Sequence, residues 1–251
     1  MAAAQENLIS PPAEGSAHRP VPAVVATAFV LVVLVLVNVA EYLVRGGLRF
    51  GPLVAGVLLV FARWTGLSWF QLGLGRDRLR SGSRWAIAAI AVIAVAYLAG
   101  VLLPLTRAAF LDARYHLAMP GALMSAFVVI PVGTILVEEI AFRSVLWGML
   151  ARHTTTRRVL LTSSVLFGLW HVLPSLHLAS ANQGVGDAVR GAGGSATVLV
   201  VVATVAFTAL GGVVAGELRR RSGSVLARVG MHWATNGLGV LFGVLAWHLA
   251  G

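Results

Sequence analysis

Two adjacent glutamates and an arginine stand inside a long apolar stretch, TILVEEIAFRSVLWGML, residues 134–150. A charge at the centre of a membrane helix costs roughly 2.5 to 3.5 kcal/mol on insertion scales, so such groups persist where partners or function hold them. Glu139 and Arg143 are four residues apart in the order that favours an ion pair, which leaves Glu138 without a local cation. Glu138 is therefore the first candidate for chemistry.

Two histidines lie deep in later apolar stretches, each with a polar or aromatic partner four residues away. Phe167 pairs with His171, and His232 with Asn236, so each pair shares one face of a helix. Counted at 1.5 Å per residue from the nearest arginine-rich turn, Glu138, His171 and His232 lie about 21, 20 and 16 Å deep. Three helices can thus bring these residues to one site.

Each of these residues also has a structural explanation. A lone membrane histidine, or Asn236 alone, commonly hydrogen-bonds a neighbouring helix. Phe167 and Trp170 suit packing roles, and mutual neutralisation accounts for Glu139 and Arg143. The functional hypothesis therefore depends on the coincidence of the whole set.

The set suits water activation. Glu138 is a candidate general base, and His171 can hold the same water. His232 and Asn236 can donate hydrogen bonds to a developing oxyanion, which would support amide hydrolysis without a covalent intermediate. Glu138, His171 and His232 could instead bind Zn²⁺ with an open fourth position, and the sequence does not choose between the two. Serine catalysis is disfavoured because the chain has no G-x-S-x-G motif.

The composition is that of a membrane protein. The 251 residues are 58% hydrophobic, and the formal net charge is +10. All nineteen basic residues are arginines that fall mostly between apolar stretches, a pattern typical of topology determinants rather than of a nucleic-acid surface. With no cysteine, disulfides and thiolate chemistry are excluded.

The apolar stretches predict an all-α polytopic membrane bundle of about seven to eight transmembrane helices. We expect a disordered cytoplasmic tail at 1–20, N-terminal helices within 21–118, and a catalytic membrane core at 119–251. Aromatic residues beside arginines predict an interfacial segment at 64–84. The expected spans are 21–44, 50–62, 85–105, 121–151, 159–178, 196–216 and 224–249. The excess length of 121–151 can be absorbed by tilt, by a kink near Pro131 or by projection into the cytosol.

Alternating the loops puts thirteen arginines on one side and five on the other, with Arg143 inside the membrane. The larger group includes the four from Arg219 to Arg228. The positive-inside rule then predicts a cytoplasmic N-terminus in a multi-pass protein of the plasma membrane.

Three motifs resemble those of the CPBP (CAAX-protease and bacteriocin-processing, or Abi) intramembrane proteases. E-E-x-x-x-R is matched at residues 138–143, F-x-x-x-H at 167–171 and H-x-x-x-N at 232–236. The resemblance covers roughly 121–243 and is to the shorter bacterial branch. It implies peptide-bond hydrolysis in the membrane, with Glu138 as base, His171 positioning the water, and His232 and Asn236 as the oxyanion site. Its supporting residues would be Glu139, Arg143 and Phe167.

The leading hypothesis is an intramembrane endopeptidase acting on a membrane-associated protein or peptide. It is glutamate-type on our preferred interpretation, with no cofactor required and Zn²⁺ as the alternative. The lipid bilayer and the substrate are the expected partners, with no nucleic acid, and the oligomeric state is not predicted. Two other functions stay open: a transporter or proton relay using the same ionisable groups, and a non-catalytic bacteriocin-immunity or partner-binding membrane protein.

Overall fold

The computed structural model describes residues 21–44 and 50–251. The predicted disordered tail at 1–20 and the turn at 45–49 lie outside this part of the chain. The described residues form helices and their connections, with no strand, so the predicted all-α membrane bundle is confirmed.

Five helical segments are long and apolar enough to cross a bilayer. They are Ala23–Val44, Arg76–Leu102, Met119–Ala151, Arg190–Ser222 and Val225–Ala250. The predicted second and fifth spans are shorter, because α2 (Gly51–Trp64) has 14 residues and α8 (Thr156–Trp170) has 15. A helix needs about 20 residues to span the hydrocarbon core, so these two reach only part of the way.

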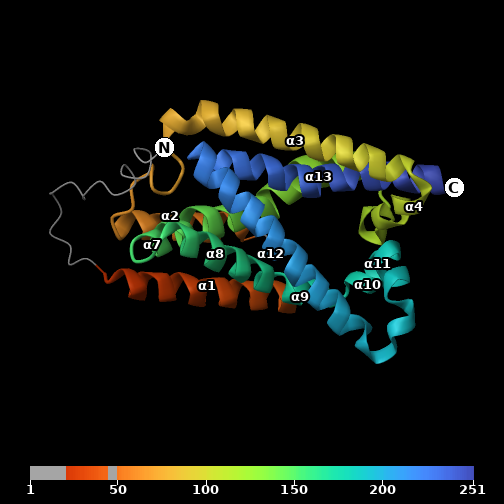
Figure 1. Cartoon of the computed structure of the whole chain (residues 1–251), viewed down its shortest axis with the longest axis horizontal. Helices are drawn as coiled ribbons and strands as arrows, with labels where there is room; N and C mark the ends of the chain where they lie inside the picture. Colours follow the sequence, from red (N-terminus) through yellow and green to blue (C-terminus); the bar gives the residue numbers. More distant parts are fainter. Residues whose placement is uncertain (1–20, 45–49) are drawn as a thin grey trace.

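In Figure 1 the helix Val225–Ala250 runs alongside Arg76–Leu102, whereas Arg190–Ser222 crosses the bundle obliquely. α13 (Val225–Ala250) packs along α3 (Leu79–Leu102), and α12 (Ala196–Ser222) packs along α8. Small residues bring the second pair close, because a Cβ on Gly168 would stand 2.7 Å from the Val205 carbonyl oxygen. α1 (Ala23–Val44) and α2 share a buried apolar core with α8 and with the helix at 119–151. Close contact of small residues is a common source of helix association in membranes.

The helix at 119–151 contains π-helical turns, each with one more residue than an α turn. It begins as α5 (Met119–Met124), widens at Ser125–Val129 and Pro131–Ile135, continues through α6 (Leu136–Glu138), widens again at Glu139–Leu146 and ends as α7 (Trp147–Ala151). Pro131 has no N–H and its ring crowds the preceding turn, which the wider turns accommodate. Pro131 thus begins a π-helical segment, a feature that was not predicted from the sequence.

The arginine-rich end of the bundle, formed by residues 63–84, 152–158 and 219–224, is closed by the connection 65–75. Leu67 and Leu72 of this connection are buried in the core. Ser144 donates to the Leu72 carbonyl at 2.7 Å, and Arg219 donates to the Gln71 carbonyl at 3.0 Å. Arg219, assigned above to an exposed loop, is therefore a buried structural residue.

The opposite end is covered by short helices. These are α4 (Pro104–Arg107), α10 (Leu178–Ala181) and α11 (Gln183–Ala188), with 3₁₀ turns at Ala108–Phe110, Ala113–Tyr115 and Arg190–Ser195. Asp112 accepts from Arg114 at 2.7 Å and forms an isolated bridge with Asn182. This cover links the connection after α3 to the segment before α12.

Candidate active site

Glu138 and Glu139 lie at the junction between an α-helical and a π-helical turn, and both are buried, at 6% and 0% exposure. Consecutive residues of a helix point in different directions. Glu138 accordingly contacts Trp170 at the end of α8, while Glu139 contacts Arg228 and His232 on α13. The glutamate pair therefore joins three helices.

Glu139 holds the His232 imidazole in a fixed orientation. Its Oε1 lies 2.7 Å from His232 Nδ1 and 3.3 Å from Arg228 Nε. At 2.7 Å a carboxylate and a ring nitrogen share a proton, so the other nitrogen, Nε2, is left for other partners. All three side chains are buried, which makes this an ion network shielded from solvent.

Glu138 has one oxygen bound and one free. The Trp170 indole N–H donates to Oε1 at 3.0 Å. Oε2 is buried and has no hydrogen-bond partner among the described residues, and it lies 3.8 Å from His232 Nε2. A buried carboxylate oxygen without a partner is costly, so this atom marks a place for a water or a substrate group.

Arg143 and Glu139 do not form the ion pair predicted from their spacing: no such contact occurs in the part of the chain that the structure describes. Instead the Arg143 guanidinium lies 4.0 Å above the Phe167 ring, and the Arg228 guanidinium lies 5.6 Å from the same ring. Glu139 takes its cation from α13 because that helix packs against the π-helical turn. Phe167 thus contacts two buried cations through its ring and has more than a packing role.

His171 lies where α8 ends. Its Nδ1 donates to the Phe167 carbonyl at 2.8 Å, which leaves Nε2 as the acceptor nitrogen. Its ring contacts the edge of Phe167, with centroids 4.7 Å apart, and the Phe167 ring lies 6.3 Å from that of His232. His171 therefore joins the cluster through Phe167, with no direct bond to Glu138 among the described residues.

Asn236 is the predicted residue that the structure does not connect to the cluster. It follows His232 by one turn of α13 and is half-buried. Its side chain makes no hydrogen bond within residues 21–44 and 50–251. Its amide is thus available to a bound group on the same helix face as His232.

The zinc alternative fits this arrangement poorly. Across the described residues there is no group of three histidine or carboxylate side chains placed to hold a metal. His232 Nδ1 faces Glu139 and His171 Nδ1 faces the Phe167 carbonyl, which leaves the Nε2 atom of each ring free, as in a metal-ligating histidine. The donor chemistry of Glu138, His171 and His232 therefore suits the predicted ligand set, but the three side chains are not grouped around one position in this geometry.

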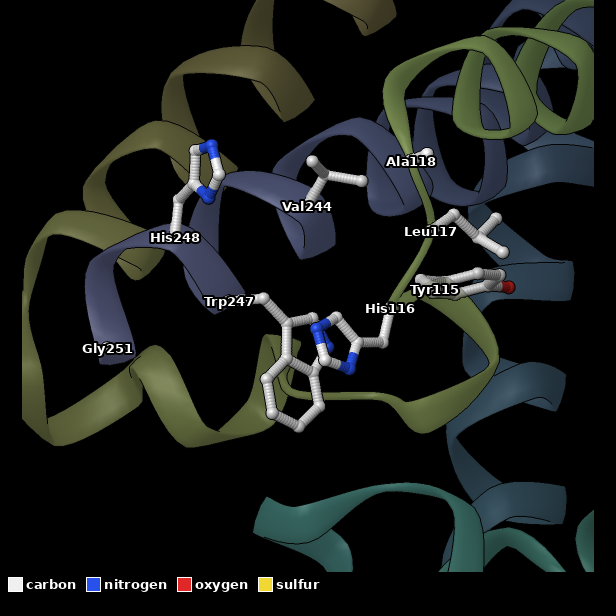
Figure 2. Close-up of a pocket in the computed structure, with 8 residues that line it drawn as sticks. All are labelled: Tyr115, His116, Leu117, Ala118, Val244, Trp247, His248 and Gly251. Atoms are coloured by element: carbon white, nitrogen blue, oxygen red, sulfur yellow. The ribbon is translucent and has the colours of Figure 1, made fainter.

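A pocket of about 340 Å³ lies elsewhere, at the end of α13 opposite the arginine-rich end. Figure 2 shows it between the C-terminal turns of α13 and the chain at 115–118. His116 stacks on Trp247 with ring centroids 4.4 Å apart. Val244 on its wall is twelve residues beyond His232, or about 18 Å along the helix, so this pocket is separate from the glutamate cluster.

Two residues of the cluster were not predicted as site residues. Arg228 was counted with the loop arginines, although it precedes His232 by four residues and so shares its helix face. Trp170 was assigned to packing, although an indole N–H next to a deep carboxylate on another helix is a donor that must find a partner when buried. The spacing of Arg228 was a usable signal, whereas the contact between Trp170 and Glu138 depends on the end of α8.

Residues 120–238 match the model of a family described as type II CAAX prenyl endopeptidase Rce1-like. No curated protein and no solved structure matches the chain. The matched segment contains all the predicted site residues and both glutamates of the cluster. Residues 120–238 of this multi-pass membrane protein are therefore similar to the Rce1-like family of type II CAAX prenyl endopeptidases, in agreement with the resemblance carried by the three motifs.

Proposed function

We propose that the protein is an intramembrane endopeptidase that hydrolyses a peptide bond of a membrane-associated protein or peptide, with Glu138 as the general base. The observation that carries this proposal is the unpartnered Glu138 Oε2, buried and 3.8 Å from His232 Nε2. A water beside this oxygen would give up a proton to Glu138 as it attacks the scissile carbonyl carbon. His171, through its free Nε2, would orient the same water.

The tetrahedral intermediate carries a negative oxygen that needs donors. We assign this role to His232 Nε2–H and the Asn236 amide, which lie on one face of α13. Donation from Nε2 requires the Glu139–His232 pair to hold two protons, one shared at Nδ1 and one on Nε2. Glu138 then returns its proton to the leaving nitrogen as the C–N bond breaks, giving a new carboxyl group and a new amino terminus.

The supporting residues orient His232 and supply positive charge to the buried site. Glu139 orients His232, and Arg228 and Arg143 supply positive charge beside the two carboxylates. The Phe167 ring lies beside both cations and both imidazoles. On this proposal no metal is needed, and the lipid bilayer and the substrate chain are the partners. We place the protein in the plasma membrane with a cytoplasmic N-terminus, by the positive-inside rule.

The test compares the N-termini of membrane proteins by mass spectrometry in cells that carry wild type, Glu138→Gln or no copy, at matched expression. New termini should occur only with wild type, and their sequences identify the substrate and the cleavage site. Glu217→Gln is the matched control, because Glu217 is a partly exposed glutamate whose ion pairs among the described residues are with Arg220 and Arg221, outside the cluster. It should leave the termini unchanged.

Two results would count against the proposal. Cleavage that survives in Glu138→Gln would remove Glu138 from its assigned role. Identical termini in all strains would favour a transporter, a proton relay or an immunity protein. A proton-flux assay in vesicles then tests the transporter and proton-relay functions, and a bacteriocin challenge tests the immunity function.

A further inference from the structure

The end of α8 is set by a proline four residues beyond Trp170. Pro174 has no N–H, so the Trp170 carbonyl loses the donor that a continuous helix would supply. The helix accordingly ends at Trp170, His171 adopts φ −87° and ψ 2°, and α9 (Val172–Ser175) begins anew. The break leaves one backbone carbonyl in need of a donor inside the bundle.

α1 supplies that donor. The Asn38 side-chain amide donates to the Trp170 carbonyl at 2.9 Å. Asn38 lies on the packed face of α1, four residues after the buried Leu34. The second half of α1 therefore borders the candidate site.

The two ends of Trp170 have different partners. Its carbonyl is held by Asn38, while its indole N–H donates to Glu138 Oε1 at 3.0 Å. Trp170 is 7% exposed, so bulk water does not replace the carboxylate as acceptor. A chain of contacts thus runs from α1 through the end of α8 to the carboxylate of Glu138.

We infer that Trp170 is a positioning residue for the catalytic base, and that Asn38 fixes Trp170 through the helix break. This inference rests on the proposed role of Glu138. The indole holds Oε1 so that Oε2 alone faces His232 and the attacking water. α1, which lies outside the matched segment 120–238, is on this inference a working part of the active site.

Trp170→Phe tests the indole contact, with Trp147→Phe as the matched control. Trp147 is equally buried, at 8%, and in the described part of the chain its indole makes no hydrogen bond. With a peptide that spans an identified cleavage site, Trp170→Phe should lower kcat by about tenfold or more and change KM by less than about twofold. Trp147→Phe should change neither constant beyond its effect on the folded fraction.

A spectroscopic measurement separates positioning from packing. The protein is labelled with ¹⁵N-tryptophan in micelles, and the indole N–H signal of Trp170 is assigned by its loss in Trp170→Phe. This signal should shift when Glu138 is changed to Gln. The Trp147 signal should not shift. If Trp170→Phe does not fold, benzothienylalanine at position 170 keeps the ring size without the N–H and should show the same loss of kcat.

Asn38→Leu tests the α1 contact, with Thr27→Val as its control. Thr27 is another hydrogen-bonding residue of α1, but it contacts His153 at the arginine-rich end. Asn38→Leu should shift the Trp170 indole signal and lower kcat, while Thr27→Val should do neither.

The outcomes are distinct. Wild-type kcat in Trp170→Phe together with an inactive Glu138→Gln overturns this inference and leaves the proposed function intact. An unmoved indole signal in Glu138→Gln likewise overturns it. Full activity in Glu138→Gln overturns both the inference and the proposed role of the base.

Discussion

Removal of Arg228 should destabilise the bundle through the charge that it leaves behind. Arg228 and Glu139 have side chains only 4% and 1% exposed, and their closest atoms are 3.3 Å apart. Arg228→Met keeps most of the side-chain volume and removes the cation. Glu139 then retains His232 as its one close polar partner among the described residues.

The magnitude follows from the burial. Two unit charges about 4 Å apart attract by about 4 kcal/mol at an effective dielectric constant of about 20. Removing one partner of a buried pair costs about 3–5 kcal/mol, because the other charge stays buried. Glu139→Gln should cost a similar amount, since it leaves Arg143 and Arg228 facing the same Phe167 ring. The double variant removes both charges and should cost less than the sum of the single variants by about 2–3 kcal/mol.

The assay is equilibrium unfolding in mixed micelles with increasing sodium dodecyl sulfate, followed by tryptophan fluorescence. A double-mutant cycle on Glu139→Gln and Arg228→Met gives the coupling free energy. The control cycle uses Glu217→Gln and Arg221→Met, a pair with 30% and 57% side-chain exposure, for which a coupling below about 1 kcal/mol is expected. Additive effects at Glu139 and Arg228, no larger than those of the control pair, would refute the buried network.

Three further predictions concern packing, acid stability and metal. Gly168→Val should destabilise the protein by more than about 2 kcal/mol in the same unfolding assay, because a Cβ at position 168 would stand 2.7 Å from the Val205 carbonyl oxygen. Gly211→Val is the control and should be nearly neutral, because a Cβ at position 211 meets open space. Burial raises the pKa of Asp112, but hydrogen bonds and charge from Arg114 outweigh it and lower the pKa below its ordinary value of 3.8. The stability from this pair should therefore be present above pH 3.8 and lost as the pH falls through the lowered pKa, and a pH series of unfolding curves for Asp112→Asn should lack that acid loss. Peptide cleavage by the purified protein should persist after treatment with EDTA and phenanthroline, and activity that returned only with Zn²⁺ would contradict the glutamate-type proposal.

Hydropathy predicted the long helices well because each is a nearly uninterrupted apolar stretch. The first span, predicted at 21–44, is observed as Ala23–Val44, and the last, predicted at 224–249, as Val225–Ala250. The fifth span was predicted to continue to 178, but α8 ends at Trp170. Pro174 was visible in the sequence, yet its effect depends on whether a neighbouring helix offers a donor to the freed carbonyl, as Asn38 does.

The candidate site was predictable where chemistry and depth coincide in the sequence. Glu138, Glu139 and His232 could be chosen because charge or imidazole at such depth needs a reason. The ion-pair partners of these residues could not be predicted. Local spacing favoured Arg143 as the partner of Glu139, but tertiary packing places Arg228 there instead. Spacing along one helix reports which groups can meet, whereas the approach of α13 decides which do.

The polar atoms of the cluster divide into those that are held and those that are free. Oε1 of Glu138, Oε1 of Glu139 and Nδ1 of both His171 and His232 each have a partner, and these contacts fix the four side chains. The free atoms include Oε2 of both glutamates and the Nε2 atoms of His171 and His232. On the proposed mechanism, Oε2 of Glu138 and the two Nε2 atoms are the positions at which a water and a carbonyl oxygen would react. Because the held atoms depend on α8 and α13, and α8 ends against Asn38 of α1, the geometry of the free atoms depends on a helix outside the matched segment. On the proposed mechanism, exchange of α1 for that of another Rce1-like protein should therefore alter catalysis even where all three motifs are kept.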